Sequence, residues 1–243
     1  MTNFIILIIL HLIGDFYLQT SKIAKCKSAN LDSYCSECTK CKSDSKFNIK
    51  YLLLHSLIYA IPFISVFFLT DLKNAICLFG IIVLTHFAID LVFCCINKKV
   101  KHTFSFLLDQ SIHIMVLYFC SHFFIFNEFP EKILSLAYIA LCALLLIVPI
   151  SVLIDKLFID LFDEHKNTEI FDVGSVIGIL ERFIIVVLAY FNSFAAIAII
   201  ITIKTWARSE DLKGKDFRNK YLLGTLASLT SALLVFLLYK ILL

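Results

Sequence analysis

The stretch ILSLAYIALCALLLIVPISVLI, residues 133–154, carries no charged side chain and is long enough to cross a lipid bilayer as one helix. The rest of the chain shares this character: 60% of its 243 residues are hydrophobic, and Phe is abundant while Gly and Pro are scarce. Soluble domains of this size are nearer half apolar. Long apolar runs with few breakers favour helices over alternating strands. The sequence therefore predicts an all-α, polytopic transmembrane helical bundle.

Outward from this stretch, apolar segments of similar length recur along the chain. The expected spans, about six in all, are 3–19, 51–70, 74–96, 103–126, 133–154 and 221–242. We interpret 1–243 as a single transmembrane helical domain, into which 21–50 is inserted as a Cys-rich loop. The segment 155–172 alternates apolar and charged residues, which fits an interfacial amphipathic helix.

The positions of Lys and Arg predict the topology, because these residues mark the cytoplasmic side. Loops 20–50 and 97–102 are Lys-rich, so we place both in the cytoplasm and the N-terminus outside. The basic loop 204–220 is then also cytoplasmic only if the apolar run 174–203 is a re-entrant hairpin of two short helices. Asn192 and Ser193 break that run and would form its tip. The alternative is one long tilted helix.

Three pairs of imidazole and carboxylate lie inside the expected spans, and ionisable groups there are usually functional. The partners of each pair are four residues apart and therefore share a helix face: His11 with Asp15, His86 with Asp90, and Asp109 with His113. The third pair has the reversed order and lies on a helix of reversed direction. A rise of about 1.5 Å per residue then brings the three carboxylates to one depth. His55 and Glu181 fall in the same half of the membrane.

Such a layer suits a divalent transition metal, because imidazole nitrogens and carboxylate oxygens bind zinc, manganese or iron. An ion with an open position supplies hydroxide near neutral pH, and a nearby base can assist. The expected metal ligands are His11, Asp15, His55, His86, Asp90, Asp109 and His113. The expected catalytic residues are His11, Asp15, His86, Asp90, Asp109, His113 and Glu181. The alternative is that the pairs only satisfy one another and hold the helices together.

Basic residues border this layer. Arg182 follows Glu181, and Lys204 and Arg208 are four residues apart. Because such side chains bind phosphate or carboxylate, we expect all three to contact substrate, with an anionic lipid head group as a partner besides the bilayer. The alternatives are an ion pair for Arg182 and snorkelling for the other two. A net charge of +3 does not suggest nucleic-acid binding.

The polar loop contains the pattern C-x8-C-x2-C-x2-C, formed by Cys26, Cys35, Cys38 and Cys41. Four thiolates at such spacing can hold a structural zinc ion, and the reducing cytoplasm disfavours disulfides. The alternatives are a disordered basic loop with incidental thiols, disulfides if the orientation is inverted, or an iron–sulfur cluster. The loop is also the expected docking point for a cytoplasmic protein partner.

The motifs carry a family resemblance as well. HLIGDFYLQT at 11–20, LLLHSLIY at 52–59, HFAID at 86–90 and DQSIH at 109–113 resemble an uncharacterised family of bacterial inner-membrane proteins, domain of unknown function 3307. GSVIGILERF at 174–183, KTWAR at 204–208 and YLLGTLAS at 221–228 are similar to that family too. The resemblance implies a multi-pass protein of the bacterial cytoplasmic membrane and implies no reaction. The Cys-rich insert departs from the family pattern.

The leading interpretation is a membrane-embedded, metal-dependent hydrolase that acts on a lipid-linked or amphiphilic substrate at the cytoplasmic leaflet. The same ionisable residues would also serve a transporter or a proton or metal-ion pathway. A non-catalytic membrane partner or sensor is the third interpretation.

Overall fold

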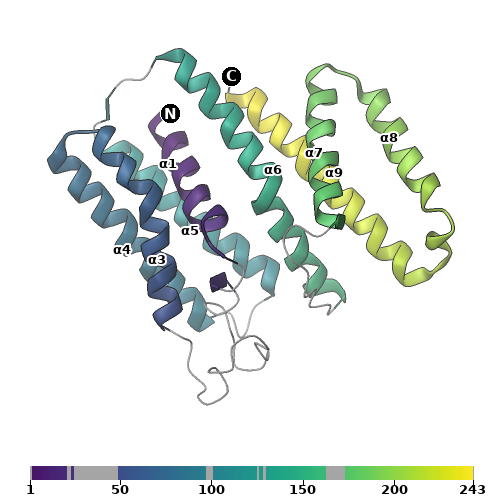
Figure 1. The fold of residues 1–243 in the computed structure, drawn as a ribbon, viewed down its shortest axis with the longest axis horizontal. Coiled ribbons are helices and arrows are strands. Elements are labelled where there is room, and N and C mark those ends of the chain that lie inside the picture. Colours follow the sequence, from purple (N-terminus) through teal and green to yellow (C-terminus); the bar gives the residue numbers. More distant parts are fainter. Residues whose placement is uncertain are drawn as a thin grey trace. The chain divides into compact units, whose positions relative to one another are not determined.

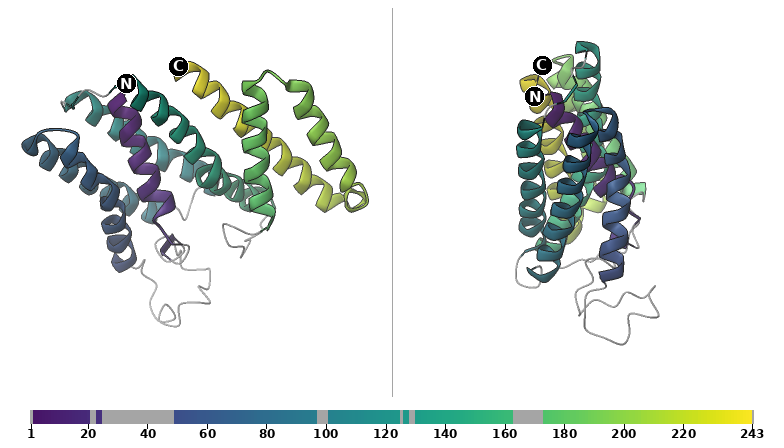
Figure 2. Two further views of the ribbon diagram at one scale, coloured as in Figure 1. Left: turned by 45° about the horizontal axis from the view of Figure 1, so that its top comes forward. Right: turned by 90° about the vertical axis from the view of Figure 1, so that its left-hand side faces the viewer.

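The computed structural model describes residues 2–20, 23–24, 49–96, 101–124, 126–127, 130–162 and 173–242. Within these residues the chain is helical and contains no strand, as Figures 1 and 2 show. It divides into two compact units, Met1–Ala137 and Tyr138–Leu243, and each has its own hydrophobic core. The predicted all-α architecture is confirmed.

Among the residues that the structure describes, four complete α-helices lie in the first unit. In chain order its elements are α1 (Thr2–Leu12), the π-helical turn η1 (Ile13–Tyr17), α3 (Ile49–Phe63), the 3-10 turn η2 (Ile64–Phe68), α4 (Leu72–Ile96) and α5 (His102–Phe123). Helix α1 packs against α3 and α5, and α4 packs against the same two helices. Asp71 precedes α4 and accepts the backbone N–H of Asn74, which holds the pKa of the Asp71 carboxyl below its ordinary value.

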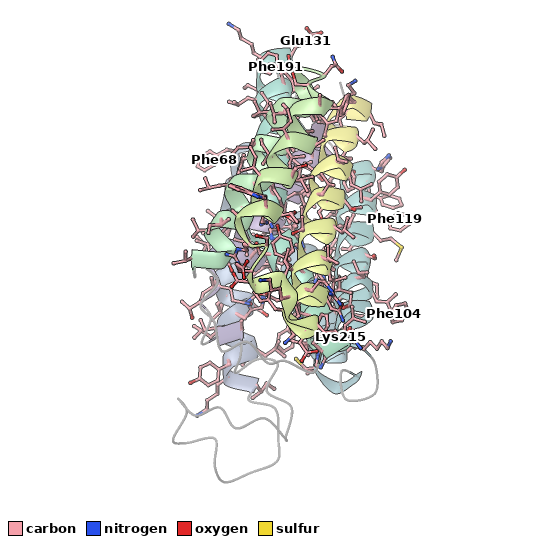
Figure 3. The ribbon with its side chains drawn as sticks, turned by 90° about the vertical axis from the view of Figure 1, so that its right-hand side faces the viewer. Phe68, Phe104, Phe119, Glu131, Phe191 and Lys215 are labelled. Carbon is pink, nitrogen blue, oxygen red and sulfur yellow. The ribbon has the colours of Figure 1, made fainter. Side chains whose placement is uncertain are left out.

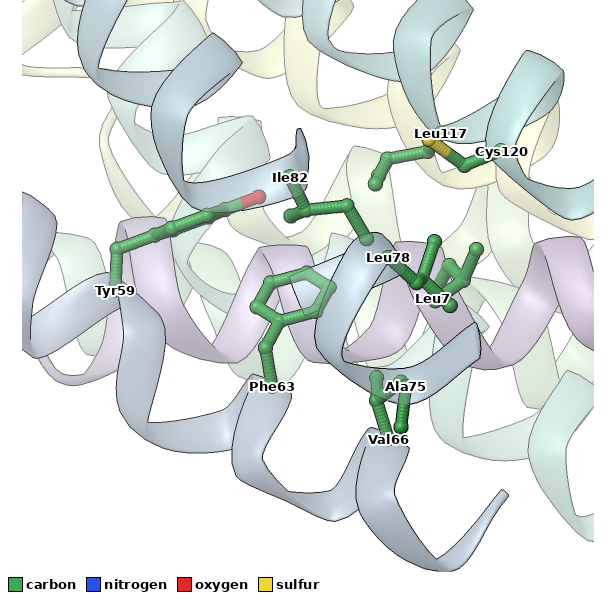
Figure 4. Close-up of a cluster of buried hydrophobic side chains, with 9 residues drawn as sticks. All are labelled: Leu7, Tyr59, Phe63, Val66, Ala75, Leu78, Ile82, Leu117 and Cys120. Atoms are coloured by element: carbon green, nitrogen blue, oxygen red, sulfur yellow. The ribbon is translucent and has the colours of Figure 1, made fainter. Parts of the chain in front are cut away.

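Each of these helices turns one apolar face inward. The buried positions recur at helical spacing and form the cluster drawn in Figure 4: Leu7, Tyr59, Phe63, Val66, Ala75, Leu78, Ile82, Leu117 and Cys120. Tyr59 lies at one edge of this core. The opposite faces carry large exposed apolar side chains, such as Phe104 and Phe119 on α5, which project outward in Figure 3. Such faces suit contact with lipid.

The second unit begins inside a helix. Its elements are α6 (Glu131–Phe162, from Tyr138 onward), α7 (Val173–Tyr190), α8 (Phe194–Ala207), the short 3-10 turn η3 (Asp211–Lys213) and α9 (Lys215–Leu242). Helix α7 packs against both α8 and α9. Leu146, Ile185, Ile197 and Phe236 are among the side chains of its core. The last expected span therefore starts six residues early, at Lys215 rather than at Tyr221.

Among the described residues, six helices are long and apolar enough to cross a membrane: Ile49–Phe68, Leu72–Cys94, His102–Phe123, Glu131–Phe162, Val173–Tyr190 and Lys215–Leu242. Thr2–Tyr17 and Phe194–Ala207 are shorter apolar helices. The chain is thus a multi-pass membrane protein. The first expected span, 3–19, is a shorter helix than the sequence suggested. Of the expected amphipathic segment 155–172, residues up to Phe162 continue α6, and 163–172 lie outside the described residues.

The apolar run 174–203 is a helical hairpin and not one long helix. Asn192 has a positive φ of 56°, a conformation that Asn tolerates better than most residues. The N–H of Ser193 donates to the carbonyl of Leu188 and that of Asn192 to Ala189, so α7 ends in a Schellman motif. The predicted hairpin with its tip at Asn192 and Ser193 is confirmed. Its re-entrant placement in the membrane stays a prediction.

Gly14 permits a close approach of η1 to α3. A Cβ atom at this position would lie 2.9 Å from Cδ2 of Tyr59, 3.0 Å from its carbonyl oxygen and 3.2 Å from its Cα. Backbone atoms cannot move aside as a flexible side chain can. The site therefore requires glycine for space, and the π-helical turn around it directs Asp15 toward α3.

We expect Gly14→Ala to destabilise the protein by about 1–3 kcal/mol, because the added methyl group forces η1 and α3 apart. Gly80→Ala is the matched control, since a Cβ atom at Gly80 meets nothing within 4 Å in the described part of the chain. The midpoint of thermal unfolding in detergent measures both. Equal midpoints for the two variants would show that the close approach is not needed.

Candidate metal centre

Four electron-rich side-chain atoms converge in the first unit, contributed by η1, α3 and α4. Nε2 of His55 lies 3.1 Å from Oδ1 of Asp15 and 3.3 Å from Oδ2 of Asp90. Nε2 of His86 lies 3.1 Å from Nε2 of His55 and 3.6 Å from Oδ2 of Asp90. All four side chains are buried. The π-helical turn, one helix face of α3 and the four-residue spacing on α4 together produce this convergence.

These separations match the edges of a coordination polyhedron. Zinc bonds to imidazole nitrogen and carboxylate oxygen of about 2.0–2.1 Å imply ligand-to-ligand edges of roughly 3.3 Å in a tetrahedron. The four measured distances run from 3.1 to 3.6 Å. The ligand atoms of Asp15, His55 and His86 can therefore hold one ion, and Asp90 lies close enough to His55 and His86 to join them.

A second set of donors shares His86. His86, Asp90 and His113 each offer a ligand atom, and these atoms lie within 4.8 Å of one another, as do those of Asp15, His55 and His86. The Nδ1–H of His113 donates to the backbone carbonyl of Asp109 at 2.9 Å. Its Nε2 therefore carries the lone pair, and this buried atom makes no hydrogen bond within the described chain. A backbone carbonyl at the far ring nitrogen is the usual arrangement for a metal-binding histidine.

The amide of Gln110 fixes the protonation of a neighbouring histidine. Its Nε2 donates to Asp15 at 2.9 Å and to Asp109 at 3.1 Å, so its Oε1 must face His11. Nε2 of His11 then carries the proton and donates to Gln110 at 3.2 Å. Nδ1 of His11 accepts from the Tyr59 hydroxyl at 3.1 Å. Both ring nitrogens of His11 are thus taken, and His11 supports the cluster instead of offering a ligand atom.

Tyr59 orients His86 through its ring. The two rings are nearly parallel, with an interplanar angle of 5° and centroids 3.5 Å apart. The Tyr59 hydroxyl is held by His11, so the plane of the His86 imidazole is fixed by two contacts in sequence. Tyr59 therefore belongs both to the apolar core and to the polar cluster.

Among the described residues, the cluster reaches the surface at Asp109. The Asp109 side chain is 18% exposed, whereas those of His113, Asp90, His55 and His86 are 3% exposed or less. Asp109 is therefore the most exposed of these five residues.

The structure brings His11, Asp15, His55, His86, Asp90, Asp109 and His113 together in one unit. The other predicted site residues lie in the second unit: Glu181, Arg182, Lys204 and Arg208. The four cysteines of the predicted loop zinc site, Cys26, Cys35, Cys38 and Cys41, lie outside the described residues.

Sequence reasoning missed Tyr59 and Gln110. Tyr59 lies four residues after His55, the spacing that singled out the other pairs, so the same rule would have found it. Gln110 lies next to Asp109 within the DQSIH motif. Its role depends on contacts with α1 and η1, which spacing within one helix does not reveal.

We expect Tyr59→Phe to lower stability by about 1–3 kcal/mol, since it leaves Nδ1 of His11 buried without a donor. Tyr138→Phe is the control, because Tyr138 is also buried but no hydrogen bond of its hydroxyl is found among the described residues. Chemical unfolding in detergent, followed by circular dichroism, compares the two. A Tyr59→Phe variant as stable as the control would contradict the proposed chain of hydrogen bonds.

Comparison with known proteins adds a family and no activity. Residues 3–36 and 34–137 match the family model described as protein of unknown function (DUF3307), and these residues include the whole His–Asp cluster. The motifs at 174–183, 204–208 and 221–228 lie beyond the matched residues. No curated protein and no solved structure matches the chain. More than half of the sequence is covered by the family model, so the chain belongs to the family of proteins of unknown function DUF3307.

Proposed function

We propose that the cluster binds a divalent transition metal and that the protein is a membrane-embedded, metal-dependent hydrolase. Asp15, His55, His86 and Asp90 would hold the ion. The observation that carries the proposal is the environment of Nε2 of His55, which has two carboxylate oxygens and a second imidazole nitrogen within 3.3 Å.

Protons alone account poorly for this environment. Nε2 of a neutral imidazole holds either one proton or one lone pair, so it can donate to one neighbour only. Any unpaired carboxylate or lone pair in an apolar interior is costly. A divalent cation accepts electron pairs from all four atoms at once. A mixed set of imidazole and carboxylate ligands suits zinc, manganese or iron.

The surroundings of the ion support hydrolysis. Nε2 of His113 has its lone pair free and lies on a ring whose centroid is 4.6 Å from that of His86. It can accept a proton from a water molecule that the ion activates. Asp109 is partly exposed, so water would enter from its side. The exposed apolar helix faces favour an amphiphilic or lipid-linked substrate, and the Lys-rich loops favour access from the cytoplasmic leaflet of a bacterial inner membrane.

A metal-ion pathway is the second candidate. Two ligand sets share His86, so an ion held by Asp15, His55 and His86 has a second set, with Asp90 and His113, beside it. Four protein donors also fill a tetrahedron, whereas a catalytic ion needs an open position. In this case His113 would be a ligand and not a base. His113 therefore has a different role in each candidate function: it is a general base in the hydrolase and a metal ligand in the ion pathway.

The cysteine loop remains a proposed zinc site on its spacing alone, with Cys26, Cys35, Cys38 and Cys41 as ligands. It is also the proposed contact for a cytoplasmic protein. Zinc bound by the loop would add to the total metal content, so it must be distinguished from an ion bound in the membrane.

We expect purified full-length protein to contain one transition metal that His86→Ala removes. His122→Ala is the matched control, since His122 is an exposed histidine on the same helix as His113. Elemental analysis of the detergent-solubilised proteins measures the metal. The loop is identical in both variants, so its zinc cancels, and Cys38→Ser reports that zinc separately.

Asp90→Asn provides a second variant of nearly unchanged shape if His86→Ala does not fold. It should also lower the metal content, because an amide is a poorer ligand than a carboxylate. Equal metal in both variants and in the His122→Ala control would overturn the metal proposal and would favour simple pairing of the side chains.

The role of His113 separates hydrolase from ion pathway. If His113 is the general base, the His113→Gln variant should keep the metal and hydrolyse substrate about 10²–10⁴-fold more slowly. Release of p-nitrophenol from p-nitrophenyl butyrate and bis-p-nitrophenyl phosphate in mixed micelles measures the rate. An equal rate of metal-dependent p-nitrophenol release in His113→Gln and the wild type would argue against a general base at His113. The ion pathway would be supported instead by two results together. The wild type would carry zinc into proteoliposomes without hydrolysing either substrate, and His113→Gln would abolish the zinc uptake.

A further inference from the structure

The second unit contains a partly open cavity of about 340 Å³. Side chains of α6, α7, α8 and α9 line it. Its apolar wall includes Ile154, Phe158 and Tyr221, and its polar wall includes Arg182, Lys204 and Ser228. Cavities of this size are at the lower end of those that bind small ligands. A phosphate group with a short polar extension fits the volume.

Arg182 is the central feature of the polar wall. Only 3% of the residue is exposed, yet its guanidinium contacts neutral acceptors alone. Nε donates to the carbonyl of Leu146 at 2.8 Å, and Nη2 donates to the hydroxyl of Ser151 at 2.7 Å and to the carbonyl of Ile147 at 3.4 Å. No carboxylate in the described part of the chain forms an ion pair with it. Two acids, Asp155 and Glu181, also line the cavity and attract the guanidinium electrostatically, but neither contacts it. A buried charge without a paired counter-ion in contact is unfavourable.

The remaining nitrogen of Arg182 is available to a ligand. Nη1 makes no hydrogen bond with the described residues, and it lies beside Gly178, where a Cβ atom would be 3.6 Å away. The adjacent acid, Glu181, makes its direct ion pair with Lys204, at 2.5 Å, and not with the guanidinium. The alternative of an ion pair for Arg182 is thus not found, because Glu181 pairs with Lys204 instead.

Two further groups point to an anion. Ser228 is 7% exposed, and its buried hydroxyl has no hydrogen-bond partner in the described structure. Arg208 is exposed at the rim over the ring of Phe217, 5.9 Å from its centroid, and forms no ion pair with any described residue. A hydroxyl donor, a guanidinium edge and a second cation are the groups that bind phosphate.

We propose that this cavity binds the phosphate group of an anionic ligand, through Nη1 of Arg182, the hydroxyl of Ser228 and the side chains of Arg208 and Lys204. The apolar wall favours a phospholipid head group as the source, and free phosphate is the other source of the same chemistry. The inference rests on the proposed function in one respect only: a substrate of the proposed hydrolase would bind this site through its anionic head group. Anion binding itself does not require the metal.

Isothermal titration calorimetry of the full-length protein in detergent tests the site with three probes: dihexanoyl phosphatidic acid, dihexanoyl phosphatidylcholine and inorganic phosphate. We expect saturable binding of phosphatidic acid and at least tenfold weaker binding of phosphatidylcholine. Phosphatidic acid that binds more tightly than phosphate identifies a lipid head group. Phosphate that binds as tightly, and competes with the lipid, identifies the free ion.

Four variants assign the binding to the cavity. Arg182→Gln should weaken it by about 10–100-fold, the effect of one charged hydrogen bond. Ser228→Ala should weaken it by about fivefold yet leave the empty protein as stable or more stable, because it removes an unpaired hydroxyl. Arg208→Gln should weaken binding by up to about fivefold. Lys213→Gln is the control, since Lys213 is an exposed lysine outside the cavity that pairs with Glu210.

If Arg182→Gln does not fold, Ser228→Ala and Arg208→Gln decide the question. Equal affinities for these two variants and for Lys213→Gln would overturn the proposal, as would an absence of saturable binding in the wild type. His86→Ala should bind phosphatidic acid as the wild type does. Loss of the metal without loss of anion binding therefore distinguishes a failure of the metal proposal from a failure of this one.

Discussion

The contact between the backbone of η1 and Tyr59 determines whether the polar cluster exists. Gly14 brings the two within van der Waals distance, and Asp15 follows it directly. From that position Asp15 reaches Nε2 of His55 at 3.1 Å and accepts the amide of Gln110 at 2.9 Å. An α-helical continuation of α1 would aim the carboxylate differently, because a π-helical turn holds more residues per turn. One small residue thus links the packing of the first unit to its chemistry.

The cluster is ordered by hydrogen bonds that pass from helix to helix. Gln110 fixes the tautomer of His11, His11 holds the hydroxyl of Tyr59, and the ring of Tyr59 fixes the plane of His86. Within an apolar interior each of these groups needs a partner. The supporting residues are satisfied by one another, whereas the lone pair of His113 and the convergence at His55 are not. Buried polar atoms without a hydrogen-bond partner among the described residues include Nδ1 of His55 and Nε2 of His113, both at the place where we propose an ion.

Most of the helices could be predicted from apolar runs of membrane-spanning length, and the hairpin from the polar break at Asn192 and the distribution of Lys and Arg. The four-residue spacing found six of the cluster residues because neighbours on one helix face are visible in sequence. Partners on different helices are not, which is why the role of Gln110 and the bonds from Arg182 to α6 emerged only from the fold. The π-helical turn has no sequence signature beyond a glycine among apolar residues.

The two units present opposite electrostatic demands. In the first, carboxylates and imidazoles gather with no described Lys or Arg among them, so a bound cation would balance them. In the second, a buried guanidinium and an unpaired hydroxyl face a cavity whose acids, Asp155 and Glu181, do not contact the guanidinium, so a bound anion would complete the site. Structural pairing alone would have matched these charges within each unit, as Glu181 and Lys204 do. Because low-dielectric surroundings penalise each imbalance separately, two distinct ligands explain the molecule better than one.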